Sequence, residues 1–277
     1  MWLIARKLRG VAKRLVLSPL NLRRDVRFRR EVLRSGTPLR DLTRYERRIY
    51  SQNGEDGILQ AIFARVGTTN RYFVEIGTGD GSECNTRHLA DHHDWRGLLL
   101  DGRYENPARS LYREFVTVEN INPLFAKYNV PAEFDLLSID IDGNDLWVWN
   151  SIDARWRPRV LMIEYNSSVG PDASLTIPYD QEFCWDGTTY FGSSLRALCA
   201  LAELRGYVLV ACDSRGVNAF FVRADLVAAL GEPAQAERAY RPPYYGRHLR
   251  GHPVSTQDLV PYEADRNTLS ARNETDA

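Results

Sequence analysis

Carboxylate and amide side chains gather at two places in the sequence, each directly after an apolar run. Asp140 and Asp142 lie in SIDIDGND (residues 138–145), and Glu164 and Asn166 end the run VLMIEYN. Carboxylates packed at the end of a buried strand repel one another and are costly to desolvate, so a bound cation or a substrate is expected to neutralise or use them. Because the tips of adjacent parallel strands lie about 4.8 Å apart, these four side chains are the predicted ligands of one hard cation such as Mg²⁺. They are also the candidate catalytic groups, since a carboxylate or a metal can help a hydroxyl lose its proton.

Two other interpretations of SIDIDGND stay open. Asp140 would hydrogen-bond an amino group of a bound ligand, while Asp142 and Asn144 would cap a helix that begins near Asp145. Alternate residues of an extended strand point to opposite faces, so only one of Asp140 and Asp142 is expected to ligate a metal. A calcium-binding EF-hand is excluded, because Gly143 stands fourth rather than sixth in the loop and no Glu stands twelfth.

A glycine-rich turn follows an earlier apolar run, in FVEIGTGDG at residues 73–81. Glycine lets backbone amides come close to a ligand and adopts positive φ angles without strain. A dinucleotide-binding fingerprint would need a third glycine at the position of Ser82. Acidic Glu75 and Asp80 disfavour an anionic pyrophosphate here and favour a cationic ligand. The predicted cofactor-binding residues of this turn are Glu75, Gly77, Gly79 and Gly81.

Asp101 ends the next apolar run, GLLLD, 26 residues after Glu75. A carboxylate in this place accepts hydrogen bonds from the two ribose hydroxyls of a nucleoside. Such charge-assisted bonds contribute about 1.5–3 kcal/mol each. The order strand, glycine turn, helix, strand and aspartate therefore predicts a nucleoside-containing cofactor. S-adenosylmethionine, with its sulfonium and amino groups, fits the acidic turn better than NAD does.

Strands and helices alternate from residue 51 onward, and this alternation places the candidate residues at strand ends. Apolar runs predict strands at residues 71–77, 97–101, 115–120, 134–142, 159–166, 206–213 and 217–223. Helical patterns lie at residues 51–67, 83–94, 106–115, 121–129, 146–152 and 193–206. Such alternation implies right-handed crossovers and a parallel sheet covered on both faces. The last two strands flank SRG and predict an antiparallel hairpin.

A 27-residue segment without a regular pattern, residues 166–192, interrupts the alternation. Irregular segments of this length in a compact domain are usually functional, and this one begins beside Glu164. It combines aromatic and acidic side chains, which suit a sugar-binding pocket. A second interpretation is that these side chains only pin the segment to the domain. They are Tyr179, Asp180, Glu182, Trp185, Asp186 and Tyr190.

Three other segments carry polar side chains for which a functional and a structural interpretation both stay open. His92 or His93 would act as a general base, or DHHD is a surface histidine pair. The cap of the helix at 51–67 would reach the site through Gln52 or Glu55, or serve only as a cap. The segment RPPYYGRHLRGHP (residues 241–253) would add positive charge for a phosphate-linked acceptor.

The composition is that of an ordinary globular protein, with 277 residues, 44% of them hydrophobic and 26% charged. No apolar run approaches the roughly 20 residues of a membrane-spanning helix. The cysteines have no CxxC spacing, which argues against structural zinc and a disulfide framework and predicts a reducing, cytoplasmic location. They are Cys84, Cys184, Cys199 and Cys212.

Charge is distributed unevenly along the chain. Residues 1–50 hold fifteen Arg and Lys against four Asp and Glu, and the remainder holds 21 against 32. Residues 1–17 place apolar side chains on one face of a basic helix, which predicts peripheral contact with the inner face of a membrane. A docked appendage and a solvated arm are the alternatives. Nucleic acid is disfavoured as a partner, because the chain beyond residue 50 is acidic.

Several of these motifs occur together and in order across residues 50–225, and in this they resemble the FkbM-type family of S-adenosylmethionine-dependent methyltransferases. The motifs are SQNGEDGIL, FVEIGTGDGSECNT, WRGLLLDG, FDLLSIDIDGNDLWVW, VLMIEYNSS, YFGSSLRAL and GYVLVACDSRGVNAFFVR. The resemblance implies a doubly wound, Rossmann-like α/β fold of the class I methyltransferase type, with a mostly parallel seven-stranded sheet and an antiparallel last strand. It also implies that residues 75–81 and Asp101 hold the methionine and ribose parts of the cofactor. Glu119 and Asn120 would then lie near its adenine.

The sequence thus predicts a methyltransferase domain at residues 51–230, a basic helical arm at 1–50 and a partly disordered extension at 231–277. The expected reaction is O-methylation of a hydroxyl on a sugar, a glycan or a natural product, with Mg²⁺ as a second cofactor. One alternative keeps the fold without catalysis, as a membrane-associated binding module that works through residues 1–50. Another is an NAD-linked oxidoreductase, which Ser82 disfavours.

Overall fold

The structure is a computed structural model of the chain, and it describes residues 32, 39, 41–245 and 249–265. The chain divides into two compact units, residues 1–37 and 38–277. Within the first unit the description covers Val32, which is helical and buried. All further statements concern the second unit. The basic helix expected at residues 1–17 and the tail beyond residue 265 lie outside the described residues, so membrane contact and tail disorder stay predictions.

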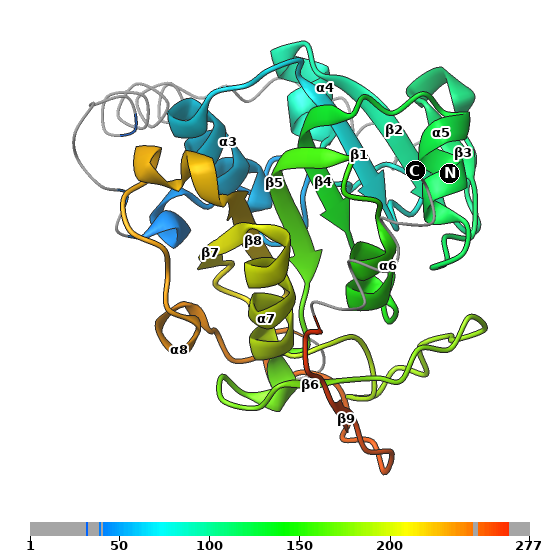
Figure 1. Ribbon diagram of the computed structural model, residues 1–277, viewed down its shortest axis with the longest axis vertical. Helices are drawn as coiled ribbons and strands as arrows, with labels where there is room; N and C mark the ends of the chain where they lie inside the picture. Colours follow the sequence, from blue (N-terminus) through cyan, green and yellow to red (C-terminus); the bar gives the residue numbers. More distant parts are fainter. Residues whose placement is uncertain (1–31, 33–38, 40, 246–248, 266–277) are drawn as a thin grey trace, which may run out of the picture. The chain divides into compact units, whose positions relative to one another are not determined.

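A seven-stranded sheet forms the centre of the second unit (Figure 1). Its strand order is β3-β2-β1-β4-β5-β8-β7; the first five strands run parallel, and β8 is antiparallel to both of its neighbours. The predicted doubly wound, Rossmann-like α/β fold with an antiparallel last strand is confirmed. The strands are β1 (Tyr72–Ile76), β2 (Arg96–Asp101), β3 (Leu111–Arg113), β4 (Glu133–Ile139), β5 (Arg157–Glu164), β7 (Tyr207–Cys212) and β8 (Asn218–Arg223).

The register brings the carboxyl ends of four parallel strands level. Ile76 of β1 pairs with Leu100 of β2 and with Ile139 of β4. Ile139 in turn pairs with Ile163 of β5. The strand order reverses between β1 and β4, and ligands of open α/β sheets bind beyond the strand ends at such a point. The four aligned residues Ile76, Leu100, Ile139 and Ile163 are hereafter called the level row. The residues directly after them in the chain are Gly77, Asp101, Asp140 and Glu164.

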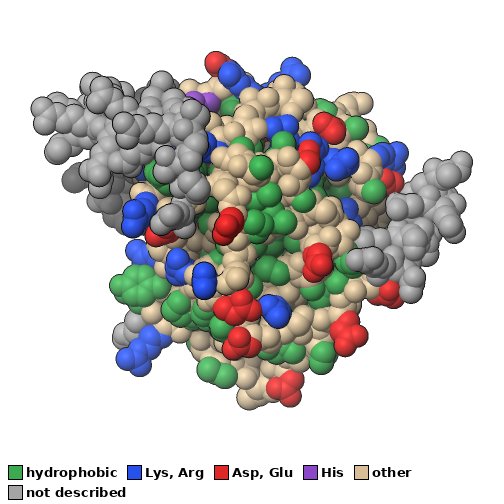
Figure 2. Space-filling view, turned by 60° about the vertical axis from the view of Figure 1, so that its left-hand side comes forward, with side chains coloured by type: hydrophobic (Ala, Val, Ile, Leu, Met, Phe, Trp, Pro, Cys, Tyr) green, Lys and Arg blue, Asp and Glu red, His purple; other side chains and the backbone are tan. Residues whose placement is uncertain are grey.

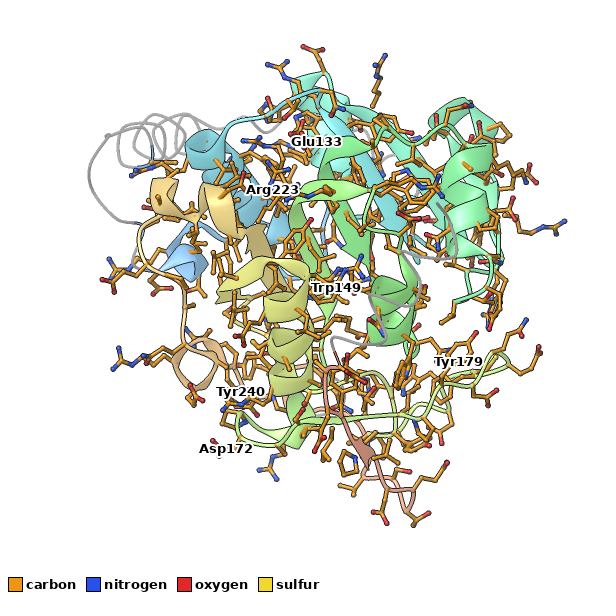
Figure 3. The ribbon with its side chains drawn as sticks, in the orientation of Figure 1. Glu133, Trp149, Asp172, Tyr179, Arg223 and Tyr240 are labelled. Carbon is orange, nitrogen blue, oxygen red and sulfur yellow. The ribbon has the colours of Figure 1, made fainter. Side chains whose placement is uncertain are left out.

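Helices and strands bury nearly continuous apolar runs between them. One core cluster joins alternate strand residues with residues of α5, α6 and α7. Trp149 of α6, labelled in Figure 3, is 2% exposed and contacts the rings of Tyr207 and Phe221 in this cluster. The intervening strand residues are buried as well, as a sheet covered on both faces requires. The α-helices are α3 (Glu55–Val66), α4 (Arg87–His93), α5 (Ile121–Lys127), α6 (Asp145–Ser151), α7 (Leu195–Arg205) and α8 (Ala236–Ala239).

The segment between β2 and α5 differs from its prediction. The helix expected at residues 106–115 and the strand expected at 115–120 are both wrong, because the chain forms a short 3₁₀ turn, Pro107–Arg109, and then β3. Ser110 has a φ of 56°, which ends the turn and lets Leu111 start pairing with β2. Local helix propensity was overridden here by a strand partner that is distant in sequence.

Residues 39 and 41–50 make specific contacts within the second unit. The sequence had placed them in the N-terminal arm, because residues 1–50 are strongly basic. Glu46 accepts hydrogen bonds from both the backbone and the hydroxyl of Ser214, at 2.6 Å each. Asp56 accepts from the backbone of residues 49–51 at the start of α3. The arm boundary at residue 50 stays a prediction.

Two further observations concern the surface and the hydropathy of the described residues. On the face shown in Figure 2, their basic and acidic side chains are interspersed, and the absence of a nucleic-acid partner stays a prediction. In the same part of the chain, no helix combines the length and the hydrophobicity that a bilayer crossing requires.

Gly77 is predicted to be indispensable for the level row. Its φ is 84°, and a Cβ atom there would lie 1.5 Å from the carbonyl oxygen of Asp140. We expect Gly77→Ala to lower the free energy of unfolding by about 3–4 kcal/mol in urea titrations, because β1 and β4 would have to separate. Gly206→Ala is the matched control: Gly206 has a φ of 74° with open space around it, so it should lose only about 1–2 kcal/mol. If the two variants lost equal free energy of unfolding, the close approach of Gly77 to the Asp140 carbonyl would not be what makes Gly77 necessary.

Candidate functional site

Three carboxylates meet at the ends of β4 and β5. One oxygen each from Asp140, Asp142 and Glu164 lies within 4.8 Å of the others. The Oε2 atom of Glu164 is buried and has no hydrogen-bond partner. An unpartnered buried carboxylate oxygen beside two further carboxylates is expected to be satisfied by a cation or by a ligand that donates hydrogen bonds. These three residues, hereafter the acidic cluster, were all predicted for the site.

The turn after β4 explains why both aspartates join the acidic cluster. Asp142 has a φ of 57°, so the chain leaves the extended conformation there and both carboxylates reach the same side. The continuous strand on which the expectation of a single metal ligand rested is therefore not formed, and the number of aspartates that would ligate a metal stays a prediction. Asp145 holds the turn, because its two oxygens accept from the backbone N–H groups of Ile141 and Gly143 at 2.9 Å each. The predicted side-chain cap of α6 by Asn144 is not formed.

Burial and mutual repulsion raise the pKa values of the acidic cluster. Desolvation is the main cause of the raised pKa values of Asp140 and Glu164, and the neighbouring carboxylates raise them further. Desolvation also raises the pKa of Asp142, while His252 and Arg103 oppose that rise. The pKa of Asp145 is raised to about 6, mainly by its burial. The cluster therefore favours a bound cation or retained protons at neutral pH.

Asn166 does not belong to the acidic cluster. Its side chain is fully buried, and its amide nitrogen donates to the carbonyl oxygens of Thr189 and Phe191 at 2.9 and 2.8 Å. Its Oδ1 accepts from the backbone of Ser168 at 3.0 Å. Asn166 thus joins the two ends of the irregular segment 166–192, and these bonds do not support its predicted role as a metal ligand or catalytic group.

The glycine turn and Asp101 lie side by side, as the prediction required. The backbone N–H of Gly79 donates to Oδ2 of Asp101 at 2.7 Å. Gly77, Gly79 and Gly81 all have positive φ angles, and Gly79 has open space where a side chain would stand. The other oxygen of Asp101 accepts from the backbone of Arg103 and Tyr104 at 2.8 and 3.1 Å. A carboxylate has about four acceptor positions, so Asp101 keeps capacity for a hydroxyl.

Glu75 has a structural role that the sequence did not predict. It is 2% exposed, and it accepts from the backbone N–H groups of Asn85 and Thr86 at 2.7 and 3.0 Å. The Thr86 hydroxyl adds a third bond of 2.6 Å. Glu75 thus orders the approach to α4, and the expected direct contact between its carboxylate and a ligand has no support in this geometry.

Glu119 and Asn120 stand in the loop that leads from β3 to α5. Glu119 is exposed and accepts from the hydroxyl of Tyr179 at 2.6 Å, which lowers the pKa of Glu119. Burial and this bond raise the pKa of Tyr179 to about 12. The Asn120 amide is used within its own loop, where Oδ1 accepts from Thr117 and Nδ2 donates to the carbonyl oxygen of Phe115, both at 2.8 Å. Their proximity to an adenine stays a prediction.

The irregular segment is pinned across the carboxyl edge of the sheet. Asn144 donates to the carbonyl oxygen of Asp180 at 2.7 Å, and Trp147 donates to that of Ile177 at 2.9 Å. The ring of Phe183 packs so closely on Gly143 that a Cβ atom there would clash at 2.4 Å. Tyr179, labelled in Figure 3, extends the segment to Glu119. The pinning interpretation is therefore correct in part, and sugar binding stays a prediction.

His252 is a neighbour of the site that the sequence interpretation missed. Its ring lies 4.5 Å from that of Trp185, 5.0 Å from that of Tyr245 and 5.8 Å from that of Phe191. Asp142 and His252 each influence the pKa of the other. Residues 241–253 were singled out in the sequence only for their charge, because no local pattern shows that His252 packs against Trp185, Phe191 and Tyr245.

The histidines of α4 form a separate group. His92 contacts the hydroxyl of Tyr50 at 3.3 Å, and the Nε2 atoms of His88 and His93 lie 3.3 Å apart. Gln60 lies against both His88 and His93. Burial and the neighbouring rings lower the pKa of His88 to about 3. These contacts support the structural interpretation of DHHD.

Comparison of the chain with models of known protein families finds no match, and a comparison with curated proteins finds none either. The function is therefore inferred from the geometry of the strand ends.

Glu164→Gln is predicted to stabilise the protein, and to do so increasingly as the pH rises. The raised pKa of Glu164 means that the folded state holds its proton above the ordinary value of 4.5, so stability falls as the pH rises through that window. Removing the charge should add about 1–2 kcal/mol to the free energy of unfolding at pH 8, and less at pH 5. The exposed control Glu203→Gln should change the free energy of unfolding by no more than about 0.5 kcal/mol at either pH. Destabilisation by Glu164→Gln at pH 8 would refute the repulsion argument.

Proposed function

We propose that the protein is an S-adenosylmethionine-dependent methyltransferase that methylates a hydroxyl group of a small-molecule or glycan acceptor. The observation that carries the proposal is the level row at the ends of four adjacent strands. The residues that come directly after it, at the switch point, are Gly77, Asp101, Asp140 and Glu164. Asp101, the proposed ribose-binding carboxylate, lies beside the open glycine turn, and the acidic cluster lies on the other side of that turn.

The cofactor side is supported by the pairing of Gly79 with Asp101. The turn leaves open space at the Cβ position of Gly79, and a Cβ on Gly81 would meet only Leu111, at 3.7 Å, so a ligand can approach the backbone of the turn. Asp101 would accept the ribose hydroxyls, and the methionine part would lie over the turn, on the side of the acidic cluster. A sulfonium and an ammonium group suit this electronegative edge, whereas a pyrophosphate would be repelled.

The acceptor side is supported by the acidic cluster. Methyl transfer is an in-line displacement: the acceptor oxygen attacks the methyl carbon, and the electron pair of the C–S bond stays on sulfur. The hydroxyl proton must leave, and we assign its removal to Asp142, the most exposed member of the acidic cluster. A raised pKa makes a carboxylate a better base near neutral pH.

The same residues fit a divalent cation. The donor set consists of hard oxygen atoms, and the unpartnered Oε2 of Glu164 is the kind of atom that a metal satisfies. Asp140, Asp142 and Glu164 would hold Mg²⁺ there, and the ion would lower the pKa of a bound hydroxyl. The aromatic residues of segment 166–192, together with His252, would line the acceptor, and a hydroxyl of a sugar or a natural product is the proposed class.

Asp101→Asn tests the cofactor side. Calorimetry should show that the wild-type protein binds S-adenosylhomocysteine, and that the variant binds it about tenfold to hundredfold more weakly, because one charge-assisted bond is lost. Asp258→Asn, at an exposed site on the C-terminal segment, is the matched control and should bind as the wild type does. A wild-type protein that bound neither S-adenosylmethionine nor its product would rule the proposal out.

Magnesium should stabilise the wild-type protein through the acidic cluster. At a hundredfold excess over its Kd, MgCl₂ is expected to add about 2.7 kcal/mol to the free energy of unfolding. Thermal scans with MgCl₂, against KCl at equal ionic strength, would measure this. Asp140→Asn and Glu164→Gln should abolish the response and Glu203→Gln should keep it; a response that survives in both cluster variants would place the metal elsewhere.

A further inference from the structure

Two histidine rings and a glutamine amide meet between α3 and α4. The Nε2 atoms of His88 and His93, both on α4, lie 3.3 Å apart. The side-chain amide of Gln60, on α3, contacts Nε2 of His88 and lies 3.0 Å from Nε2 of His93. Both rings therefore face one common point, and the three residues are hereafter called the histidine–glutamine cluster.

The spacing of the two ring nitrogens matches that of neighbouring ligands around a metal ion. Zinc binds histidine nitrogens at about 2.0–2.1 Å in a tetrahedral arrangement, which sets two ligand atoms roughly 3.4 Å apart. The separation of 3.3 Å between the Nε2 atoms of His88 and His93 agrees with this value. A single ion in the place where the Gln60 amide nitrogen stands can therefore reach both nitrogens without a movement of α4.

The buried ring of the cluster is in the protonation state that a metal requires. His88 is 7% exposed, and burial together with the neighbouring histidines lowers its pKa to about 3. A metal binds the neutral imidazole, so at neutral pH it does not have to displace a second proton from this ring. His93 and Gln60 are half-buried, which leaves the cluster a route to solvent.

We propose that His88, His93 and Gln60 bind a divalent transition-metal ion such as Zn²⁺, at a site separate from the acidic cluster. Imidazole suits zinc, copper and nickel, whereas magnesium prefers oxygen ligands. A half-turn of the amide places Oε1 of Gln60 as the third ligand, and water supplies the fourth. The ion would join α3 to the helix that follows the glycine turn.

The affinity of this site is expected to be lower than that of a structural zinc site with four protein ligands. With the metal on Nε2, the ring proton of His88 stands on Nδ1, which is buried and has no hydrogen-bond partner among the described residues. Histidine ligands of tight zinc sites usually donate this second N–H to an acceptor.

His92 provides a matched control on the same helix. Its ring is exposed and stacks on that of Tyr50, with 5.9 Å between the ring centroids, and its Nε2 contacts the Tyr50 hydroxyl at 3.3 Å. Replacing His92 removes an imidazole from α4 but none of the proposed ligands.

Calorimetric titration of the full-length, tag-free protein with ZnCl₂ tests the proposal. All titrations are made in the Glu164→Gln background, so that the acidic cluster is impaired as a competing site. His88→Gln and His93→Gln should each weaken zinc binding by about a hundredfold, since the loss even of an outer partner costs about tenfold to hundredfold. His92→Gln should stay within about threefold. Gln60→Glu should bind zinc about tenfold more tightly, because it offers a charged oxygen ligand.

Each result decides the proposal independently of the proposed methyl transfer. Zinc binding that is absent in the Glu164→Gln background, or unchanged in His93→Gln, would overturn it, and equal losses in His92→Gln and His93→Gln would do the same. A purely hydrogen-bonded cluster predicts no gain of affinity in Gln60→Glu, so that outcome would remove Gln60 from the ligand set. Thermal unfolding in EDTA checks that each variant is folded, and the half-buried position of His93 keeps the test valid if His88→Gln does not fold.

Discussion

The pairing register of four parallel strands is the constraint on which the rest of this structure depends. Because Ile76, Leu100, Ile139 and Ile163 stand level, the residues after them are forced to one edge, where the backbone leaves the sheet. A shift of one residue in any of these strands would turn its buried side chains to the other face. The apolar core on both faces therefore fixes the site, and Gly77 allows β1 and β4 to approach closely enough for it to form.

Electrostatics at this edge are unfavourable for the isolated protein. The acidic cluster, Asp145 and Glu75 are placed in or beside a buried region, and desolvation raises their pKa values. Glu75 and Asp145 offset that cost by accepting backbone hydrogen bonds. The acidic cluster includes an unpartnered oxygen, so retained protons, a ligand or a cation would have to offset its cost. Glu75 and Asp145 therefore order the backbone, whereas the acidic cluster keeps an oxygen that no backbone group uses.

Sequence patterns identified the strand-end residues well where the pattern was local and strong. Asp140, Glu164, Asp101 and the glycines follow apolar runs whose burial on both faces could be predicted from the runs themselves. Predictions were less successful where the structure of a segment depends on a partner that is distant in the sequence. The strand at residues 111–113 forms because β2 is beside it, and Asn166 bonds to residues 189 and 191, more than twenty positions away. Nor did any pattern show that His252 returns to the acidic cluster.

Outside residues 106–120, the sequence by itself determined the order of strands and helices in the sheet domain, the alternation that makes the sheet mostly parallel, and the residue types at the strand ends. These depend on periodicity and on local turn chemistry, which neighbouring residues specify. Only the tertiary structure decided which carboxylates meet, because the positive φ of Asp142 brings it beside Asp140 and the sheet register brings Glu164 to both. It also decided that Glu75 and Asn166 serve the backbone, because a buried polar group bonds to whatever donor or acceptor the folded chain places within reach.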